Sequence, residues 1–345
     1  MTADAIDTTA LGDPPTSVVL EVERLTVRYQ EGDRTVEAVT DLSLSLRRGR
    51  TVVLIGESGC GKTTAALAIL GMLPQTATIP SGRIRIDAGG RSVDMLSVPD
   101  AELRSLRWNH VAYVPQSSIS AFNPIQRIGQ HFRQTADAHR MARGAAEARA
   151  SELLAAVHLD PHRVWHSYPH ELSGGTRQRV AIALAMLLDP AVIILDEPTT
   201  ALDVLTQDAV LRTLLELQES TGVSYLAITH DLAVAAALAD DLVTMYAGRA
   251  VEVGQAADVL AEPLHPYTRG LLRSMPSVDS HAAAEPIGGY PPSMANLPPG
   301  CAFHPRCALA EQSCRSGPSP DLVRFAGRSV ACPIVATAQG PGEGR

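Results

Sequence analysis

The clearest chemistry in this sequence is carried by one glycine-rich segment, Gly56-Glu57-Ser58-Gly59-Cys60-Gly61-Lys62-Thr63-Thr64. It follows a short apolar run typical of a buried strand, residues 51–55, and precedes a helix-like run, residues 65–72. The segment fits the pattern G-x-x-x-x-G-K-[ST], the P-loop, whose backbone N–H groups surround a polyphosphate at the positive end of a helix. We expect Lys62 to contact the β- and γ-phosphates and the Thr63 hydroxyl to bind Mg²⁺.

The position of Lys62 strengthens this interpretation. It is the only lysine among 29 basic residues, and all the others are arginine. A lysine ammonium is a compact charge on a flexible stem, which suits contact with phosphate. A chance glycine-rich turn would give no reason for the only lysine to lie here.

Two acidic residues, Asp196 and Glu197, follow another short apolar run, residues 191–195. Ligands of α/β sheets bind at the carboxyl ends of the strands, so both acids are expected near the phosphates. We expect Asp196 to hold Mg²⁺, directly or through water. Glu197 is placed to orient or deprotonate the attacking water in phosphoryl transfer.

A second phosphate-binding turn, without lysine, is predicted at Ser173-Gly174-Gly175, which opens a helix with a capping serine. With this segment, residues 18–275 clearly resemble the ATP-binding cassette (ABC) family. The family more often has glutamine, methionine or glutamate where this chain has Thr176, but Ser173 and Gly175 are intact, so we expect activity to be retained. The resemblance implies four more site residues: Gln116 of the Q-loop, which senses Mg²⁺ and the γ-phosphate, Asp203 of the D-loop, His230 as the switch histidine at the γ-phosphate, and Tyr29 stacking on adenine.

In that family two cassettes pair head to tail, and each ATP lies between the P-loop of one chain and the Ser-Gly-Gly turn of the other. Closing such a pair completes the set of donors around the γ-phosphate and excludes water. The resemblance therefore implies a second ABC ATPase subunit, identical or a paralogue, as a partner.

The expected fold class is α/β: a P-loop (RecA-like) ABC nucleotide-binding domain with an antiparallel β subdomain and a helical subdomain, plus a small C-terminal cysteine module. We expect strands at residues 18–29, 36–46, 82–87, 111–114, 191–195 and 224–229, with 241–246 and 249–253 completing the sheet. The main helices are expected at residues 99–106, 145–159, 177–188, 204–220, 232–240 and 266–275. The predicted organisation is a disordered leader (1–16), the ABC domain (17–275, helical subdomain about 117–188), a Pro/Gly linker (276–300), a four-cysteine module (301–335) and a flexible tail (336–345).

Composition limits the function classes. The net charge of −8 and a pI near 5.8 disfavour a nucleic-acid partner, because binding phosphate backbones needs a basic face. The longest apolar runs, residues 180–188 and 232–239, are too short to cross a bilayer. The acidic N-terminus lacks the features of a secretory signal, which favours the cytosol.

Four of the five cysteines, Cys301, Cys307, Cys314 and Cys332, lie close together in the sequence. In a reducing compartment such a cluster indicates metal more than disulfides. Four thiolates could hold a [4Fe–4S] cluster or tetrahedral Zn²⁺. The tight C-x₂₋₄-C pairs of zinc knuckles are absent, and the wider spacing together with the family resemblance favours iron–sulfur, with Zn²⁺ and unligated thiols as the alternatives. We expect a structural role.

The C-terminal segments 264–272, 291–293 and 298–307 look like the corresponding region of the oligopeptide/dipeptide importer ATPases. That resemblance implies an ATPase that energises peptide import from the cytoplasmic face of the plasma membrane, with two transmembrane permeases and an extracytoplasmic substrate-binding protein. Three alternatives stay open: a nickel or metal-chelate importer ATPase, a soluble ABC ATPase outside transport, and an iron–sulfur redox regulator that uses ATP as a signal.

Overall fold

Strand β3 (Thr51–Ile55) lies in the middle of the main sheet and is buried on both faces. Successive side chains of a strand point to opposite faces, and here Val52 and Leu54 enter one hydrophobic core while Val53 and Ile55 enter another. Both faces are therefore covered, which explains why this strand reads as an unbroken apolar run rather than an alternating one.

The computed structural model describes residues 17–32, 34–116, 121–274 and 285–338.

The main sheet has the strand order β11-β12-β10-β9-β3-β8-β7-β6, parallel from β9 to β6 and antiparallel from β9 to β11. Its remaining strands are β6 (Val111–Val114), β7 (Val192–Asp196), β8 (Ser224–Thr229), β9 (Asp241–Tyr246), β10 (Arg249–Gln255), β11 (Val323–Phe325) and β12 (Arg328–Val330). The carboxyl ends of β3 and β7, on either side of β8, lie at the same edge of the sheet. This edge therefore carries the P-loop after β3, Asp196 as the last residue of β7, and Glu197 directly after it.

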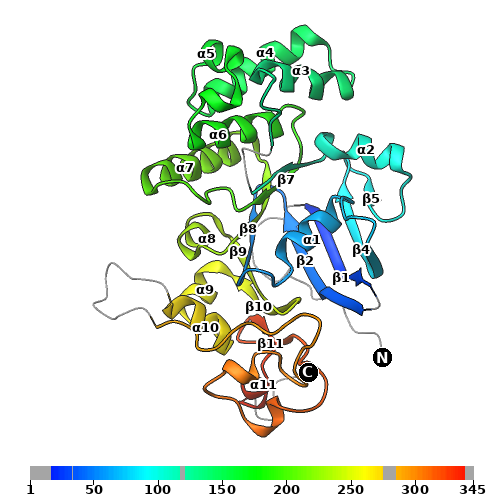
Figure 1. Cartoon of the computed structure of the whole chain (residues 1–345), viewed down its shortest axis with the longest axis vertical. Helices are drawn as coiled ribbons and strands as arrows, with labels where there is room; N and C mark the ends of the chain where they lie inside the picture. The colour runs from blue at the N-terminus through cyan, green and yellow to red at the C-terminus, as the bar shows by residue number, and fades with distance from the viewer. Residues whose placement is uncertain (1–16, 33, 117–120, 275–284, 339–345) are drawn as a thin grey trace.

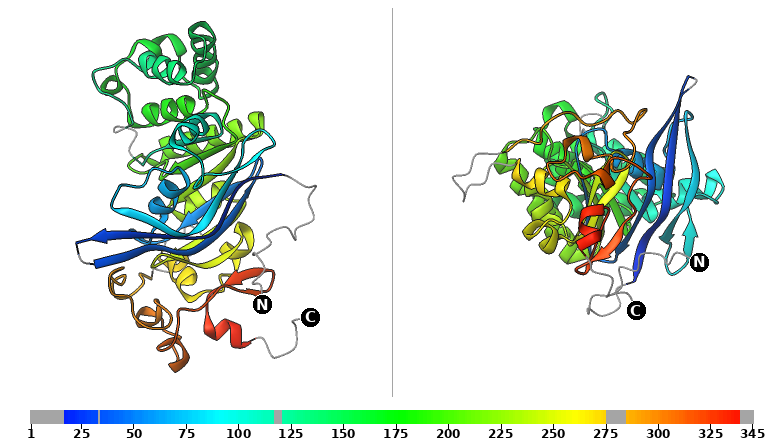
Figure 2. Two further views of the ribbon diagram at one scale, coloured as in Figure 1. Left: turned by 90° about the vertical axis from the view of Figure 1, so that its right-hand side faces the viewer. Right: turned by 90° about the horizontal axis from the view of Figure 1, so that it is seen from below.

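A second, antiparallel sheet has the order β2-β1-β4-β5 and lies along one side of the molecule (Figure 2). Its strands are β1 (Val18–Glu31), β2 (Arg34–Arg47), β4 (Ala77–Asp87) and β5 (Ser92–Asp94). Helix α1 (Lys62–Ile69) packs between the two sheets and shares a core with both (Figure 1). The first residue of α1 is the P-loop lysine, so this core fixes where the P-loop ends.

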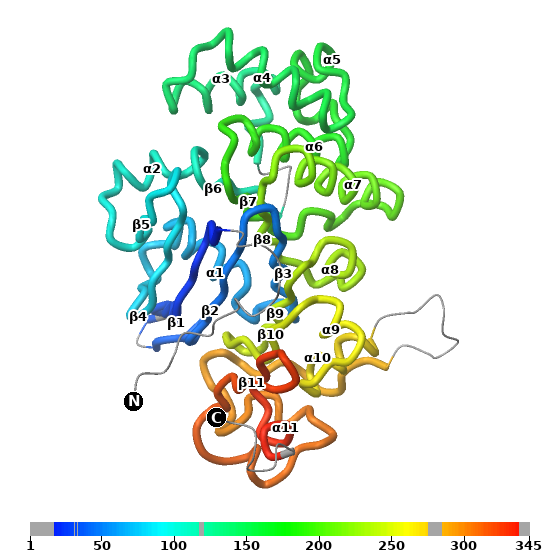
Figure 3. Tube along the Cα trace, turned by 180° about the vertical axis from the view of Figure 1, so that it is seen from behind, coloured from blue at the N-terminus to red at the C-terminus, as the bar shows by residue number. Residues whose placement is uncertain are grey.

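The helices form a lobe at one end of the molecule and a layer beside the main sheet (Figures 1 and 3). The lobe contains α3 (Ile128–Ala138), α4 (Arg143–Ala156), α5 (Pro161–His166) and α6 (Gly174–Ala185). The other helices are α2 (Asp100–Asn109), α7 (Val204–Thr221), α8 (Leu232–Leu238), α9 (Ala256–Ala261), α10 (Pro266–Arg273) and α11 (Pro333–Ala338), with short 3₁₀ turns at η1 (Pro169–Glu171), η2 (His304–Arg306) and η3 (Gln312–Cys314). Within the described ranges, no helix is long and apolar enough to cross a membrane.

The C-terminal segment departs from the expected organisation. The prediction that β9 and β10 complete the main sheet is wrong, because β12 pairs with β10 and the hairpin β11–β12 extends the sheet. Arg328 of this hairpin lies 3.6 Å from the fully buried Glu252 and donates to the carbonyl groups at the end of α9. The segment thus packs on the cassette itself. The predicted leader, residues 339–345 of the tail and the first part of the linker lie outside the described residues.

Candidate nucleotide site

The P-loop backbone packs closely against two carbonyl groups from neighbouring strands. A Cβ atom at Gly56 would lie 2.2 Å from the carbonyl oxygen of Met245, and one at Gly61 would lie 2.2 Å from that of Ala38. Both glycines also have positive φ angles, +151° and +104°. Only glycine combines this backbone conformation with so close an approach, so both glycines are required by the packing around the loop.

Lys62 lies inside the curve of this loop and is only 6% exposed. Its Nζ donates hydrogen bonds to the carbonyl oxygens of Gly56 (2.7 Å) and Glu57 (3.0 Å). The Lys62 ammonium therefore lies within the curve of the loop, where this motif is expected to bind phosphate. Burial raises the pKa of the neighbouring Cys60 thiol, although Lys62 opposes this shift, so Cys60 is a neutral thiol at pH 7.

Asp196, the last residue of β7, is buried with 1% exposure. Its carboxylate accepts hydrogen bonds from the Thr63 hydroxyl (3.2 Å) and the Tyr113 hydroxyl (3.0 Å). Burial raises the pKa of Asp196, and these two bonds only partly offset the shift. The site thus contains a destabilised carboxylate beside the P-loop threonine, which is an arrangement that favours a bound cation.

Glu197, the first residue after β7, has a left-handed backbone conformation, with φ of 49°. Its carboxylate accepts hydrogen bonds from Gln116 Nε2 (2.6 Å) and the Thr200 hydroxyl (2.9 Å), and it lies 3.0 Å from His230 Nδ1. Burial acts to raise the pKa of Glu197, but the bonds from His230, Thr200 and Gln116 outweigh it and lower the pKa below its usual value. Glu197 is therefore a carboxylate at neutral pH.

Two other predicted site residues, Tyr29 and Asp203, lie on β1 and at the start of α7. Tyr29 is half-buried near the end of β1, where it pairs with Val36 of β2, the strand that also carries Ala38 against the P-loop. Asp203 caps helix α7 by accepting hydrogen bonds from the backbone N–H and hydroxyl of Thr206.

The Ser173-Gly174-Gly175 turn lies apart from the P-loop, at the start of α6 in the helical lobe (Figure 1). Ser173 accepts the backbone N–H of Thr176 as a helix cap, and their hydroxyls lie 2.8 Å apart. A Cβ atom at Gly175 would lie 2.0 Å from Thr206 of α7, so this glycine is required by packing. The two turns predicted to bind phosphate therefore lie on different parts of one chain, the Ser173-Gly174-Gly175 turn at the start of α6 and the P-loop between β3 and α1.

The motifs did not point to several residues that complete the centre. Tyr113 and Thr200 bind the two acidic side chains, and Tyr267 and Arg306 reach Glu57 of the P-loop. Tyr113 lies on β6, the strand that pairs with β7, and this position was the one sequence signal that could have indicated its contact with Asp196. Arg306 lies 249 residues from Glu57 in sequence, so only the tertiary structure brings the pair together.

The four C-terminal cysteines line one small cavity together with His265 and Phe303. None of the four is in a disulfide. Burial raises the pKa of Cys301 to about 11 and also raises the pKa values of Cys307 and Cys332. Among the described residues, no group of three or more His, Cys, Asp or Glu side chains has the arrangement of a site for a metal ion.

Two family models match this sequence: "ABC transporter" over residues 39–200, and "Oligopeptide/dipeptide transporter, C-terminal region" over residues 251–314. The chain is 41% identical over 320 residues to the dipeptide transport ATP-binding protein DppD of Caldanaerobacter subterraneus subsp. tengcongensis, covering 92% of this chain and 97% of that protein. It is 40% identical over 330 residues to the oligopeptide transport ATP-binding protein OppD of Salmonella typhimurium, covering 94% and 96%.

The chain belongs to the ATP-binding protein family of ABC oligopeptide/dipeptide transporters. The structure is also similar to the ATP-binding cassette MJ0796, solved as a dimer in a post-hydrolysis state with ADP and Pi (TM-score 0.60, 26% identity, covering 69% of this chain and 98% of that one). A second match is cbiO1 from Clostridium perfringens, part of the ABC transporter complex cbiONQ (TM-score 0.60, 26% identity, 71% and 91%). These findings confirm the expected family and cassette fold, and they place this protein among the ABC ATPases.

Removing the buried charge should stabilise this ABC ATPase in the absence of nucleotide. The folded state raises the pKa of Asp196, so the ionised carboxylate opposes folding at neutral pH, and this penalty is lost as pH falls through the raised pKa. We expect Asp196→Asn to raise the melting temperature at pH 7 by about 2–4 °C, a typical shift for 1 kcal/mol in a large domain.

Calorimetry between pH 7 and pH 4 tests this, and the difference from wild type should shrink as pH falls. The exposed pair Asp208–Arg212 supplies a control, Asp208→Asn, whose melting temperature should stay close to wild type. A lower melting temperature for Asp196→Asn at pH 7 would contradict the account.

Proposed function

We propose that this protein binds ATP·Mg²⁺ at the P-loop and that hydrolysis of the ATP energises the import of oligopeptides or dipeptides. The carrying observation is the grouping of Lys62, Thr63, Asp196 and Glu197 at the carboxyl ends of two parallel strands. Such a grouping supplies a phosphate cradle, a metal-binding hydroxyl and carboxylate, and a carboxylate for the attacking water. The pKa of Asp196 is raised and that of Glu197 is lowered, which supports different roles for the two acids.

In this mechanism the P-loop, Gly56 to Thr64, holds the phosphates with backbone N–H groups and Lys62. Thr63, Asp196 and Gln116 would hold Mg²⁺, directly or through water, because this ion usually keeps several water ligands. When bound, Mg²⁺ would neutralise phosphate charge. Glu197 accepts a proton from the attacking water, and Gln116 and His230 keep its carboxylate in position. Tyr29 stacks on the adenine.

The second half of each site comes from another cassette. Within one chain, Ser173 and Gly175 are held in the helical lobe, away from the P-loop, so a single copy encloses the γ-phosphate on one side only. A head-to-tail pair brings the Ser173-Gly174-Gly175 turn and Asp203 of one chain to the nucleotide of its partner. The similar cassette MJ0796, described as a dimer bound to ADP and Pi, supports the pairing of two cassettes.

The assignment to peptides is supported by the relatives and by the C-terminal region. Relatives at about 40% identity are named as dipeptide or oligopeptide transport ATP-binding proteins. The chain matches 97% of the length of one such protein, and residues 251–314 match the family model described as "Oligopeptide/dipeptide transporter, C-terminal region". We accordingly place this protein at the cytoplasmic face of the membrane, bound to two permease subunits that receive peptide from an extracytoplasmic binding protein.

The four cysteines fit a thiolate-bound group by their donor set, since Cys301, Cys307, Cys314 and Cys332 all face one cavity. We favour a [4Fe–4S] cluster over Zn²⁺ because the tight C-x₂₋₄-C pairs of zinc knuckles are absent from the spacing of the four cysteines. When bound, such a group links the loops of the C-terminal segment covalently.

ATP hydrolysis in the assembled transporter should depend on both Glu197 and peptide. With the cognate permeases in proteoliposomes, we expect hydrolysis to rise when the binding protein carries a short peptide and not when it carries a nickel chelate. Glu197→Gln should retain ATP binding while hydrolysis falls at least about 100-fold, as for loss of a general base. Phosphate release and nucleotide binding measured on the same preparations test both.

Glu219→Gln, on helix α7, serves as a surface control and should hydrolyse ATP like wild type. Wild-type turnover in Glu197→Gln would refute the assignment of the base. If the nickel chelate stimulated ATP hydrolysis and the peptide did not, the proposed substrate would be a metal chelate and not a peptide.

An anaerobic preparation should be brown, with absorbance near ~400 nm from sulfur-to-iron charge transfer. Cys301→Ser should lose most of this absorbance, whereas Cys60→Ser, outside the cavity, should keep it. Iron and zinc analysis of the same samples completes the test. A colourless wild-type protein with one zinc per chain would reject the cluster in favour of zinc.

A further inference from the structure

A salt bridge joins the P-loop to the C-terminal segment, defined here as residues 285–338. Arg306, the last residue of η2, donates from Nη1 to Glu57 Oε2 (2.6 Å) and from Nη2 to Glu57 Oε1 (2.9 Å). The arginine side chain is 5% exposed and the glutamate side chain 25%. The Glu57 hydrogen bonds raise the pKa of Arg306 further. Two parallel bonds in a largely buried setting fix the orientation of both groups, unlike an ordinary surface ion pair.

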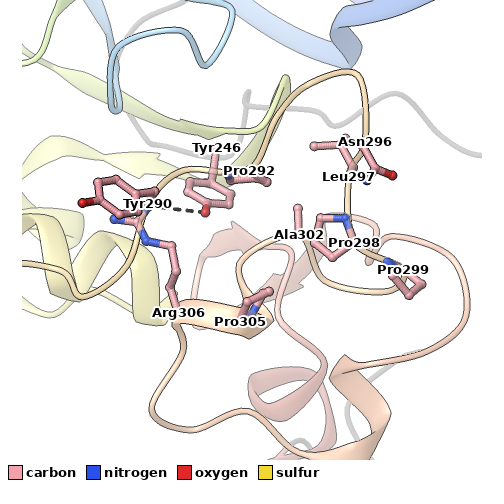
Figure 4. Close-up of a pocket in the computed structure, with 10 residues that line it drawn as sticks. All are labelled: Tyr246, Tyr290, Pro292, Asn296, Leu297, Pro298, Pro299, Ala302, Pro305 and Arg306. Carbon is pink, nitrogen blue, oxygen red and sulfur yellow. Dashed lines mark hydrogen bonds between the residues drawn. The ribbon is translucent and has the colours of Figure 1, made fainter.

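Arg306 is itself held from several sides. Its Nε donates to the carbonyl oxygen of Gly288 (2.9 Å) and its Nη1 lies 3.3 Å from the Tyr246 hydroxyl (Figure 4). The guanidinium lies 5.9 Å from the ring centroids of both Tyr246 and Phe303, within the range of cation–π attraction. The arginine is thus preorganised by the C-terminal segment and by β9 before it meets Glu57.

The backbone of the same P-loop residue is held as well. The N–H of Glu57 donates to the hydroxyl of Tyr267 (2.8 Å), a fully buried residue of α10. The ring of Tyr267 packs against Tyr246 (4.5 Å between centroids) and Phe303 (5.3 Å). The carbonyl of Glu57, in turn, accepts from Lys62 Nζ. Side chain, N–H and carbonyl of Glu57 therefore all have fixed partners, and two of the three come from beyond residue 260.

We propose that Arg306 is a positioning residue for nucleotide binding: through Glu57 the C-terminal segment sets the conformation of the P-loop. This inference rests on the proposed binding of ATP at the P-loop. A loop that is already ordered loses less conformational entropy when it closes on a ligand, so its affinity is higher. Without the salt bridge, Glu57 and the backbone next to Lys62 sample more conformations, and nucleotide binding weakens while the chemical step is little changed.

The test measures the dissociation constant of a non-hydrolysable ATP analogue with Mg²⁺ for the full chain, by calorimetry well below the melting temperature. We expect Arg306→Gln to weaken binding about 5- to 100-fold, the range of typical coupling between sites, and Arg306→Lys to recover part of the loss. In ATPase assays KM should rise with kcat nearly unchanged. A cavity of about 390 Å³ borders Arg306 with Tyr290 and several prolines, so glutamine meets no clash there (Figure 4).

Two comparisons separate positioning from general anchoring. In a double-mutant cycle, Glu57→Gln with Arg306→Gln should bind no more weakly than the worse single variant, because both remove one interaction. Arg249→Ala breaks another ion pair between the cassette and the C-terminal segment, Arg249–Asp321 (3.5 Å), which does not touch the P-loop. It should bind the analogue like wild type.

Wild-type affinity in Arg306→Gln, or an equal loss in Arg249→Ala, would overturn the inference and leave the proposed function standing. If the wild-type chain bound no analogue, or if Lys62→Ala bound it as well as wild type, the proposed nucleotide site would fail and the inference with it.

Discussion

A buried carboxylate whose hydrogen-bond donors are two neutral hydroxyls lies at the centre of this structure. Asp196 is taken out of water at the end of β7, and Thr63 and Tyr113 only partly offset the cost of its charge. Its neighbour Glu197 is stabilised as a carboxylate by three polar side chains, Gln116, Thr200 and His230. The end of β7 thus places one carboxylate 3.2 Å from the Thr63 hydroxyl of the P-loop, where a cation would be favoured, and the next residue carries a second carboxylate that is partly exposed to solvent.

That arrangement depends on how closely the surrounding backbone approaches. Gly56 and Gly61 place the P-loop against the carbonyl groups of Met245 and Ala38, and α1 is fixed between two sheets. The P-loop backbone therefore packs against carbonyl groups of β9 and β2. In addition, Tyr267 and Arg306 hydrogen-bond to Glu57 of the loop. The C-terminal segment, which extends the main sheet through β12, belongs to this support rather than standing beside it.

The sequence predicted the parts of the site that depend on local pattern. Buried parallel strands read as apolar runs, and the residues that follow β3 and β7 must meet at one edge, so Lys62, Thr63, Asp196 and Glu197 could be grouped without coordinates. The pairing of β10 with β12 was missed, because three-residue strands carry too little periodicity to be recognised. Arg306 was missed because nothing near it in sequence shows that Glu57 is its partner.

The separation of the two turns proposed to bind phosphate makes a direct structural test possible. A crystal or cryo-EM structure of Glu197→Gln with ATP and Mg²⁺ should show the triphosphate within the curve of residues 56–63, with Lys62 Nζ moved from the loop carbonyls onto the phosphates. The Ser173-Gly174-Gly175 turn of a second cassette should cover the γ-phosphate. A triphosphate bound elsewhere, or a Lys62 still hydrogen-bonded to Gly56 and Glu57 with nucleotide present, would contradict the account.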